Sequence, residues 1–478
     1  MNLAAACFVT FAPILAVALL SGRLISRATG EQKPSIVIAT GLAFGLVGYG
    51  VVVIMLGHLQ MFRTTVFLVI AVAATCVSVW RYRTLVAWAK ACFRGLLETW
   101  KASPLLATAV AGVFAMATAL QWVSPLGPDE RDYKWGTPLA YAAEHGFLEV
   151  DARLSNGVYL SQLLSVPAAS FRNVIAARWL GLIALLMLAA AVWFITKVFS
   201  GDARWAVLLL ATSPVIIYRW NGTGSDLLGA SLALLAAAWV VSGKLDSRRA
   251  AVIGILVAAS IATKVIMVAP VAIVLAWALL RARKEGASNK SVLSYIVIFG
   301  GSVLGSFALS ALQTMVVSGR LSDTRSRPLY PSGSAELARG VAAGRIPSLH
   351  DILILPVTPF VSGLRSVEPY GTRIGLLMVV GLALALVAVF IAPSPWRERI
   401  RPALLIGAIS YFAVAPLFIK TRFLVFSWGM WTAAVGITLG WLRSSVRRSV
   451  WILIGAGATC LGGIEMINAS VLLLRSLR

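Results

Sequence analysis

The chain has 478 residues, of which 59% are hydrophobic and 13% are charged, and its mean hydropathy is +0.87. So few polar residues cannot cover a water-soluble globule of this size, and we predict a polytopic membrane protein. The formal net charge is +24. Its lysines and arginines stand in short clusters between apolar segments, where they orient helices and meet anionic lipid. The composition therefore excludes a soluble protein and argues against a nucleic-acid partner.

Neither the cysteines nor the N-terminal segment indicates a secreted or metal-binding protein. The four cysteines lie scattered in or beside apolar segments without CxxC spacing, so they predict no metal site and no disulfide framework. The first apolar segment lacks a basic start and a small-residue cleavage site. We therefore expect a retained helix rather than a signal peptide.

Apolar segments of roughly 20 residues, enough to cross a ~30 Å hydrocarbon core as a helix, recur along the chain. They cover residues 3–22, 35–57, 63–80, 104–123, 174–196, 204–220, 226–242, 250–280, 292–317, 372–392, 402–419, 422–441 and 450–473. Because residues 250–280 can hold two short helices, we predict an all-α polytopic membrane protein with about fourteen transmembrane helices.

The basic clusters predict the orientation of these helices, since lysine and arginine in short loops favour the cytoplasm. The clusters are Arg23/Arg27/Lys33, Arg81/Arg83/Lys90/Arg94/Lys101, Lys197/Arg204, Lys244/Arg248/Arg249, Arg281/Arg283/Lys284/Lys290, Arg397/Arg399/Arg401 and Arg443/Arg447/Arg448. They share one side only if residues 250–280 form two helices that turn at Lys264. The other side then holds that turn, both termini and the loops 124–173, 219–225, 318–371 and 419–422. An Ala- and Arg-rich chain suggests a bacterial inner membrane, with the second side facing the periplasm.

Three segments are predicted to lie outside the spans. Residues 81–101 alternate basic and apolar residues at helical spacing, which is typical of an interfacial helix on the cytoplasmic side. Residues 159–171 are apolar but too short to span and contain Pro167, so we expect an interfacial helix. Loop 318–371 is rich in Pro, Gly and Ser, which indicates an irregular loop with short helices. It is either a solvated cap or, as we favour, a lid that excludes water from a site.

An acidic cluster follows the apolar segment 104–123. The stretch GPDERDYKW contains Asp129, Glu130 and Asp132, and further carboxylates follow up to Asp151. Many of these can be an ordinary solvated loop. Asp129 and Glu130 stand directly after Pro128, near the end of a predicted helix, where partial desolvation raises a carboxyl pKa toward that of a useful general base.

Two charged residues interrupt later apolar segments. Asp226, in NGTGSDLLGAS, stands where a helix starts, so it either caps that helix or is a functional carboxylate that substrate approaches past Gly222 and Gly224. Lys264, in ASIATKVIMVAP, either extends to the interface or is paired at a polar site, because an isolated charge there is costly.

Cations near the other predicted periplasmic turns can hold a phosphate. Lys420 and Arg422 flank the turn in PLFIKTRFLVF, and Arg219 precedes Trp220. A guanidinium group grips phosphate oxygens through two donors. Carboxylates and cations at one face of a helical bundle suit a phosphate-bearing lipid substrate and a hydroxyl group that must lose its proton.

The order of these features resembles the GT-C superfamily of membrane glycosyltransferases, which includes the protein O-mannosyltransferases and the aminoarabinose transferase of lipid A. A D-E-x-x-Y motif, from Asp129 to Tyr133, follows a spanning segment. It is followed in order by GSDLLGASLALLAAA, ATKVIMVAP and KTRFLVF. The resemblance covers roughly residues 104–441. It leaves residues 1–101 as additional helices with a cytoplasmic interfacial segment, and residues 102–478 as a GT-C-like catalytic module with extracytoplasmic loops.

By this resemblance, the protein transfers a hexose or pentose from a polyprenyl-phosphate carrier to an acceptor hydroxyl outside the cytoplasm. The acceptor would be a cell-envelope glycan, a glycolipid or a glycoprotein. The resemblance implies that Asp129 is the base and that Lys264 and Arg422 bind the lipid phosphate. We add Glu130 and Asp226 as further catalytic carboxylates. The remaining predicted substrate-binding residues are Asp132, Tyr133, Arg219, His350, Arg365, Tyr370 and Lys420.

We expect an inverting transfer without a cofactor and without a metal. A divalent cation held jointly by Asp129, Glu130 and Asp226 is the alternative. The competing functional class is transport or lipid handling, in a secondary transporter or a flippase or ligase for lipid-linked glycans, because intramembrane charges and many spans occur there too.

Overall fold

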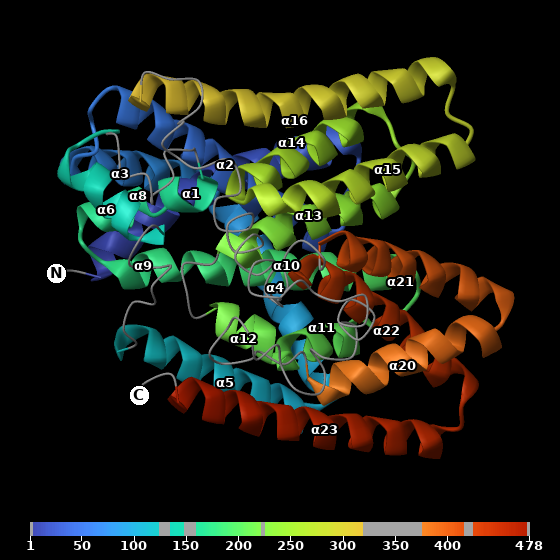
Figure 1. Ribbon diagram of the computed structural model, residues 1–478. Helices are drawn as coiled ribbons and strands as arrows, with labels where there is room; N and C mark the ends of the chain where they lie inside the picture. Colours follow the sequence, from blue (N-terminus) through green and yellow to red (C-terminus); the bar gives the residue numbers. More distant parts are fainter. Residues whose placement is uncertain are drawn as a thin grey trace, which may run out of the picture.

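The computed structural model describes residues 3–123, 134–147, 159–220, 225–318, 375–414 and 424–475 (Figure 1). Every regular element in these ranges is a helix. The helices are α1 (Leu3–Thr29), α2 (Pro34–His58), α3 (Thr64–Trp80), α4 (Tyr82–Ala102), α5 (Pro104–Val123), α6 (Gly136–Ala143), α7 (Leu160–Leu163), α8 (Val166–Ser170), α9 (Val174–Arg178), α10 (Leu180–Val198), α11 (Ala203–Thr212), α12 (Pro214–Trp220), α13 (Ser225–Ser242), α14 (Ser247–Thr263), the 3-10 turn η2 (Val265–Met267), α15 (Val268–Lys284), α16 (Asn289–Ser318), α20 (Leu376–Ile391), α21 (Ser394–Val414), α22 (Val425–Ser445) and α23 (Arg448–Arg475). The predicted all-α class is confirmed for the described residues.

The long helices make this an integral membrane protein. Eight helical segments in the described ranges are long and apolar enough to cross a membrane: α1, α2, α5, α9 with α10, α13, residues 289–308 of α16, α22 and residues 448–471 of α23. The bent pair of α3 and α4 would bring this number to nine. The other predicted spans also form helices, but these are shorter or carry more charge. The count of about fourteen spans therefore remains a prediction.

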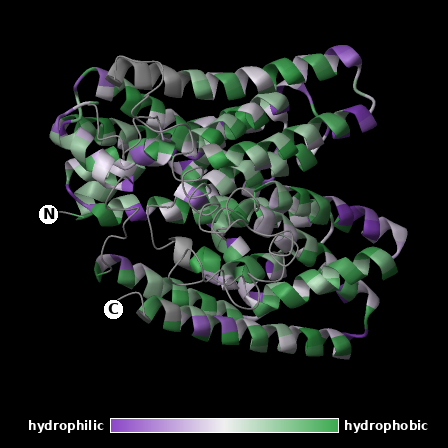
Figure 2. Ribbon diagram, in the orientation of Figure 1, coloured by the Kyte–Doolittle hydropathy of each residue, from purple (hydrophilic) through white to green (hydrophobic). Residues whose placement is uncertain are grey.

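Apolar surface covers the outside of the bundle along most of its length. Figure 2 shows hydrophobic residues over much of the outer helices and hydrophilic residues mainly toward the helix ends. Large apolar side chains such as Leu105, Leu304 and Phe390 are exposed on outer helices. In a water-soluble protein such a surface would cause aggregation, whereas in a bilayer it faces lipid.

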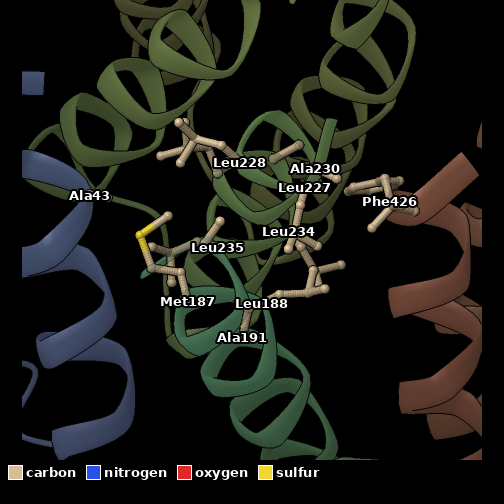
Figure 3. Packing of buried hydrophobic residues seen from close by; sticks show 14 of the residues in the cluster. Ala43, Met187, Leu188, Ala191, Leu227, Leu228, Ala230, Leu234, Leu235 and Phe426 are labelled. Carbon is tan, nitrogen blue, oxygen red and sulfur yellow. The ribbon is translucent and has the colours of Figure 1, made fainter. Parts of the chain in front are cut away.

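Helix α13 lies at the centre of the bundle. It is apolar on all sides, as expected of a helix surrounded by others, and 94% of its spanning window is buried. Figure 3 shows Leu227 and Leu234 of α13 among side chains of neighbouring helices, including Met187 of α10 and Phe426 of α22. This central position fixes the location of Asp226 in the first turn of α13.

The N-terminal helices pack on the rest of the bundle. The Trp239 indole of α13 donates a buried hydrogen bond of 2.7 Å to the Thr40 hydroxyl of α2. The Tyr49 hydroxyl of α2 donates in turn to the Val9 carbonyl of α1, at 2.8 Å. These contacts attach α1 and α2 to the central helix. The predicted boundary between additional N-terminal helices (residues 1–101) and a catalytic module (residues 102–478) remains a prediction.

The two short segments predicted to be interfacial both form helices. Residues 159–171 contain α7 and α8, with Pro167 in the first turn of α8, where a missing N–H costs least. Their side chains are buried in the protein rather than spread on its surface. Residues 82–102 form α4, which is bent by 79° from α3.

One end of the bundle is held by an ion cluster around Asp202. The Asp202 carboxylate accepts hydrogen bonds from Arg204 at 2.7 and 2.9 Å and from Arg443 of α22 at 3.0 Å. Burial alone would raise the pKa of Asp202, but the hydrogen bonds and positive charges of Arg204 and Arg443 outweigh it and the pKa is lowered. Because α11 and α12 run from Asp202 toward the start of α13, Asp226 lies at the other end of the bundle.

Candidate functional site

The segment 250–280 contains two helices that meet at Lys264. Lys264 has an extended backbone (φ −163°, ψ 122°) directly after α14, and the 3-10 turn η2 leads into α15. Pro270, in the first turn of α15, has no N–H to donate to the carbonyl of residue 266 and would clash with it in a continuous helix. The helix therefore ends upstream of Pro270.

The chain reverses direction at this break. Ser306 of α16 donates to the Ala258 carbonyl of α14 at 3.1 Å, and a Cβ added to Gly254 would lie 2.5 Å from the Ser302 hydroxyl. Residue numbers thus rise together in α14 and α16, so these two helices run parallel. α15 connects them and must run in the opposite direction, which confirms the turn that the basic clusters predict at Lys264.

Asp226 and Lys264 form an ion pair between the ends of two helices. The Lys264 ammonium donates to Oδ1 of Asp226. The Asp226 side chain is only 2% exposed, whereas that of Lys264 is 20% exposed. The Asp226 carboxylate is thus enclosed by protein, whereas part of the Lys264 side chain remains accessible to solvent.

Small residues bring these two helix ends together. The Ser260 hydroxyl of α14 donates to the Gly229 carbonyl of α13 at 2.8 Å. A Cβ on Gly229 would lie 3.0 Å from Cγ of Met267, so a larger residue would force the Met267 side chain to shift. Asp226 and Gly229 lie one turn apart on α13, and Lys264 directly follows the last turn of α14, which begins at Ser260, so the ion pair is part of a close helix contact.

The helix ends stabilise both charges. Asp226 lies in the first turn of α13, at the positive end of that helix dipole, and Lys264 follows the last residue of α14, at the negative end of the other. A buried ion pair nevertheless loses much hydration free energy, and charges inside a membrane bundle are rare outside functional sites.

A buried arginine lies at the end of α5. Arg178, the last residue of α9, is fully buried, and its Nη1 donates to the Gln121 carbonyl of α5 at 2.7 Å. This contact satisfies one of the carbonyls that the end of a helix leaves without an intrahelical donor. Sequence reasoning missed Arg178, although a charge inside the predicted span 174–196 was a usable signal.

A buried carboxylate holds the start of α20. Glu465 lies in the apolar helix α23, and its Oε1 accepts a hydrogen bond of 2.6 Å from the backbone N–H of Leu376. Gly375, just before that residue, has φ +108°, a conformation that favours glycine. Sequence reasoning missed Glu465 as well, although it is an acidic residue in the middle of the predicted span 450–473.

Of the predicted site residues, the structure brings Asp226 and Lys264 together. Arg219 belongs to α12, which ends shortly before α13 begins. The other predicted site residues lie outside the described residues: Asp129, Glu130, Asp132, Tyr133, His350, Arg365, Tyr370, Lys420 and Arg422.

The described ranges contain no group of three or more His, Cys, Asp or Glu residues placed to hold a metal ion. Two members of the alternative metal set, Asp129 and Glu130, lie outside these ranges. Metal independence therefore stays a prediction.

Of the comparisons with known proteins, the comparison of structures gives a likeness, and it is weak. No family model matches the sequence, and no curated protein matches it. Among solved structures, the chain is similar to the archaeal oligosaccharyltransferase AglB from Archaeoglobus fulgidus in complex with an inhibitory peptide and a dolichol-phosphate. The two share 12% sequence identity at a TM-score of 0.40, and the match covers 76% of this chain and 56% of that one. The likeness at this level does not assign the chain to a family.

Proposed function

We propose that the protein is a membrane glycosyltransferase that moves a hexose or pentose from a polyprenyl-phosphate carrier to an acceptor hydroxyl. The observation that carries this proposal is the buried ion pair of Asp226 and Lys264 at one end of the helical bundle. The order of motifs that resembles the GT-C superfamily supports it, because the same two residues occupy two of the matching motifs.

In this proposal Lys264 binds the phosphate of the carrier. An ammonium group has three donors, so Lys264 can keep its contact with Asp226 and still donate to a phosphate oxygen. The contact with Asp226 fixes the direction of the Lys264 ammonium group. A cation that is already in place loses little free energy through reorganisation during the reaction, which is the main advantage of electrostatic catalysis.

The transfer is proposed to invert the sugar configuration in one displacement. The acceptor oxygen bonds to the anomeric carbon while the bond from that carbon to the phosphate oxygen breaks. The acceptor proton passes to the Asp129 carboxylate. The electron pair leaves with the polyprenyl phosphate, whose additional negative charge Lys264 and Arg422 stabilise.

The proposed location is the extracytoplasmic face of a bacterial inner membrane. Support comes from the position of Lys264 at the opposite end of the bundle from the Asp202, Arg204 and Arg443 cluster. Basic clusters favour the cytoplasm, so the end with Asp226 and Lys264 faces away from it. Acceptors there are a cell-envelope glycan, a glycolipid or a glycoprotein.

Phosphate binding by Lys264 can be tested with the purified protein in detergent. A polyprenyl monophosphate should raise the melting temperature of the wild type, and the uncharged polyprenol should not. The Lys264→Met variant should lose this shift. Lys244→Met, which removes an exposed lysine at the other end of α13, is the matched control and should keep it. Equal shifts with polyprenol and polyprenyl phosphate would contradict the proposed phosphate site.

A further inference from the structure

Helix α4 leaves the direction of the spans. It bends by 79° from α3 at Arg81, and Pro104 starts α5 two residues after α4 ends. Figure 1 shows α4 crossing the direction of the long helices. Because α3 and α5 are both apolar helices on the outside of the bundle, α4 has to lie near the membrane surface where they end.

The inner face of α4 is packed against the protein. The Trp88 ring enters a notch formed by two glycines, since a Cβ on Gly22 of α1 would lie 2.6 Å from Cζ2 and a Cβ on Gly41 of α2 would lie 2.7 Å from Cη2. Thr99 is buried on the same face, three turns further along. The helix therefore has a fixed rotation about its axis.

A second face of α4 is apolar and exposed. Phe93 and Leu96 are each 68% exposed. The complete face consists of Tyr82, Val86, Phe93, Leu96, Leu97 and Trp100, all of them exposed. Their spacing of three, four or seven residues places them along one side of the helix. Such a side needs an apolar partner, because its burial is favourable by the hydrophobic effect.

A stripe of positive charge runs beside this apolar face. The α4 basic stripe consists of the exposed residues Arg83, Lys90, Arg94 and Lys101. At helical spacing these residues share one line, about a quarter turn from the line of Tyr82, Phe93 and Trp100. The acidic residue of α4 is Glu98. Its negative charge interacts with Arg204, in the first turn of α11.

We propose that α4 is a binding surface for anionic phospholipid, with its apolar face in the acyl region and its basic stripe on the headgroup phosphates. The partner follows from the arrangement of the two outer faces. A protein partner would have to cover an apolar face and a basic stripe at the level where the spans end, whereas a leaflet with anionic headgroups presents acyl chains and phosphates in that order. The binding is independent of the proposed glycosyl transfer.

The depth of α4 can be measured with nitroxide labels in nanodiscs. After replacement of the four native cysteines by serine, one label is placed at Phe93→Cys and another at Arg94→Cys. The label at position 93 should be relaxed mainly by oxygen, which partitions into lipid. The label at position 94 should be relaxed mainly by a water-soluble nickel complex. If the nickel complex relaxes the label at position 93 as strongly as the label at position 94, α4 is not embedded in the leaflet and the proposal is overturned.

Lipid selectivity can be tested with two matched triple variants. Nanodiscs contain phosphatidylcholine mixed with phosphatidylglycerol, and the lipid retained after detergent extraction is measured by mass spectrometry. Lys90→Gln/Arg94→Gln/Lys101→Gln should retain less phosphatidylglycerol than the wild type. The control Arg283→Gln/Lys284→Gln/Lys290→Gln removes the same charge from another exposed cluster and should retain more phosphatidylglycerol than the α4 variant. Equal retention of phosphatidylglycerol by both triple variants would overturn the proposed specificity of α4. The nitroxide measurement uses other variants, so it tests the position of α4 even if a triple variant fails to fold.

Discussion

Asp226 and Lys264 form an ion pair in which the carboxylate is almost fully enclosed and the lysine is partly accessible. The pair joins the first turn of α13 to the end of α14. Removal of one partner leaves a buried charge, which typically costs about 3–5 kcal/mol, whereas removal of both partners often costs much less. A double-mutant cycle therefore separates the pair from its surroundings.

We expect Asp226→Asn and Lys264→Met each to lower the melting temperature more than the double variant does. The measurement is thermal unfolding of the purified protein in one detergent, in the absence of ligand. If the two single decreases in melting temperature simply add in the double variant, the two residues do not interact and the proposed ion pair is contradicted.

The turn at Gly201 and helix α22 can approach closely because Gly201 and Gly440 are glycines, which have no side chain. A Cβ on Gly440 would lie 2.7 Å from Cα of Gly201, which is backbone and cannot move aside alone. We expect Gly440→Ala to destabilise the protein by about 1–3 kcal/mol through overpacking. Gly457→Ala is the control, because nothing lies within 4 Å of its added Cβ. Its effect should be neutral or slightly favourable, since alanine has the higher helix propensity.

The ion cluster around Asp202 should make stability depend on pH in the acid range. The pKa of Asp202 is lowered in the folded protein, because hydrogen bonds and charge from Arg204 and Arg443 outweigh the effect of burial. The stabilisation that the ionised Asp202 carboxylate provides is complete above the ordinary aspartate pKa, about 4. It is lost as the pH falls through the lower pKa that Asp202 has in the folded protein. Asp202→Asn should be less stable near neutral pH and lose less stability on acidification. Parallel pH curves for the two proteins would show that Asp202 does not contribute.

Glu465 should act as a hydrogen-bond acceptor for the start of α20. Glu465→Ala removes the acceptor of the Leu376 N–H, and the loss of a hydrogen bond to a charged group costs about 1.5–3 kcal/mol. Glu465→Gln keeps an oxygen at the same distance along the side chain and should retain most of the stability. Hydrogen exchange at the first amides of α20 would report the change, and equal protection in both variants would contradict this role.

The helices follow from the sequence because the bilayer leaves the backbone few alternatives. Within a span every N–H and C=O must be paired inside the chain, so an apolar segment of sufficient length becomes a helix. The break at Lys264 was predictable for a similar reason, because the basic clusters on either side of residues 250–280 have to share one side of the membrane.

The partners of the buried charges were not predictable. Arg178 meets a carbonyl 57 residues earlier in the chain, and Glu465 meets an N–H 89 residues earlier. Periodicity identifies an unusual charge in an apolar segment but contains no information on which helix end packs against it. Asp226 and Lys264 were found separately as charges at helix ends, and their pairing depends on the close contact at Gly229.

Sugar transfer from a polyprenyl phosphate can be assayed with the purified protein and defined donors. The purified protein in liposomes would be supplied with a panel of radiolabelled polyprenyl-phosphate hexoses and pentoses, with a cell-envelope fraction as the acceptor source. We predict that the wild type transfers label from at least one donor into that fraction and releases polyprenyl phosphate. Asp129→Asn and Lys264→Met should each lower the rate on the order of a hundredfold or more, and Lys244→Met should not. Movement of the intact donor across the bilayer without transfer of its sugar would identify a flippase instead of a glycosyltransferase, and an unchanged rate in both variants would exclude the proposed roles of Asp129 and Lys264.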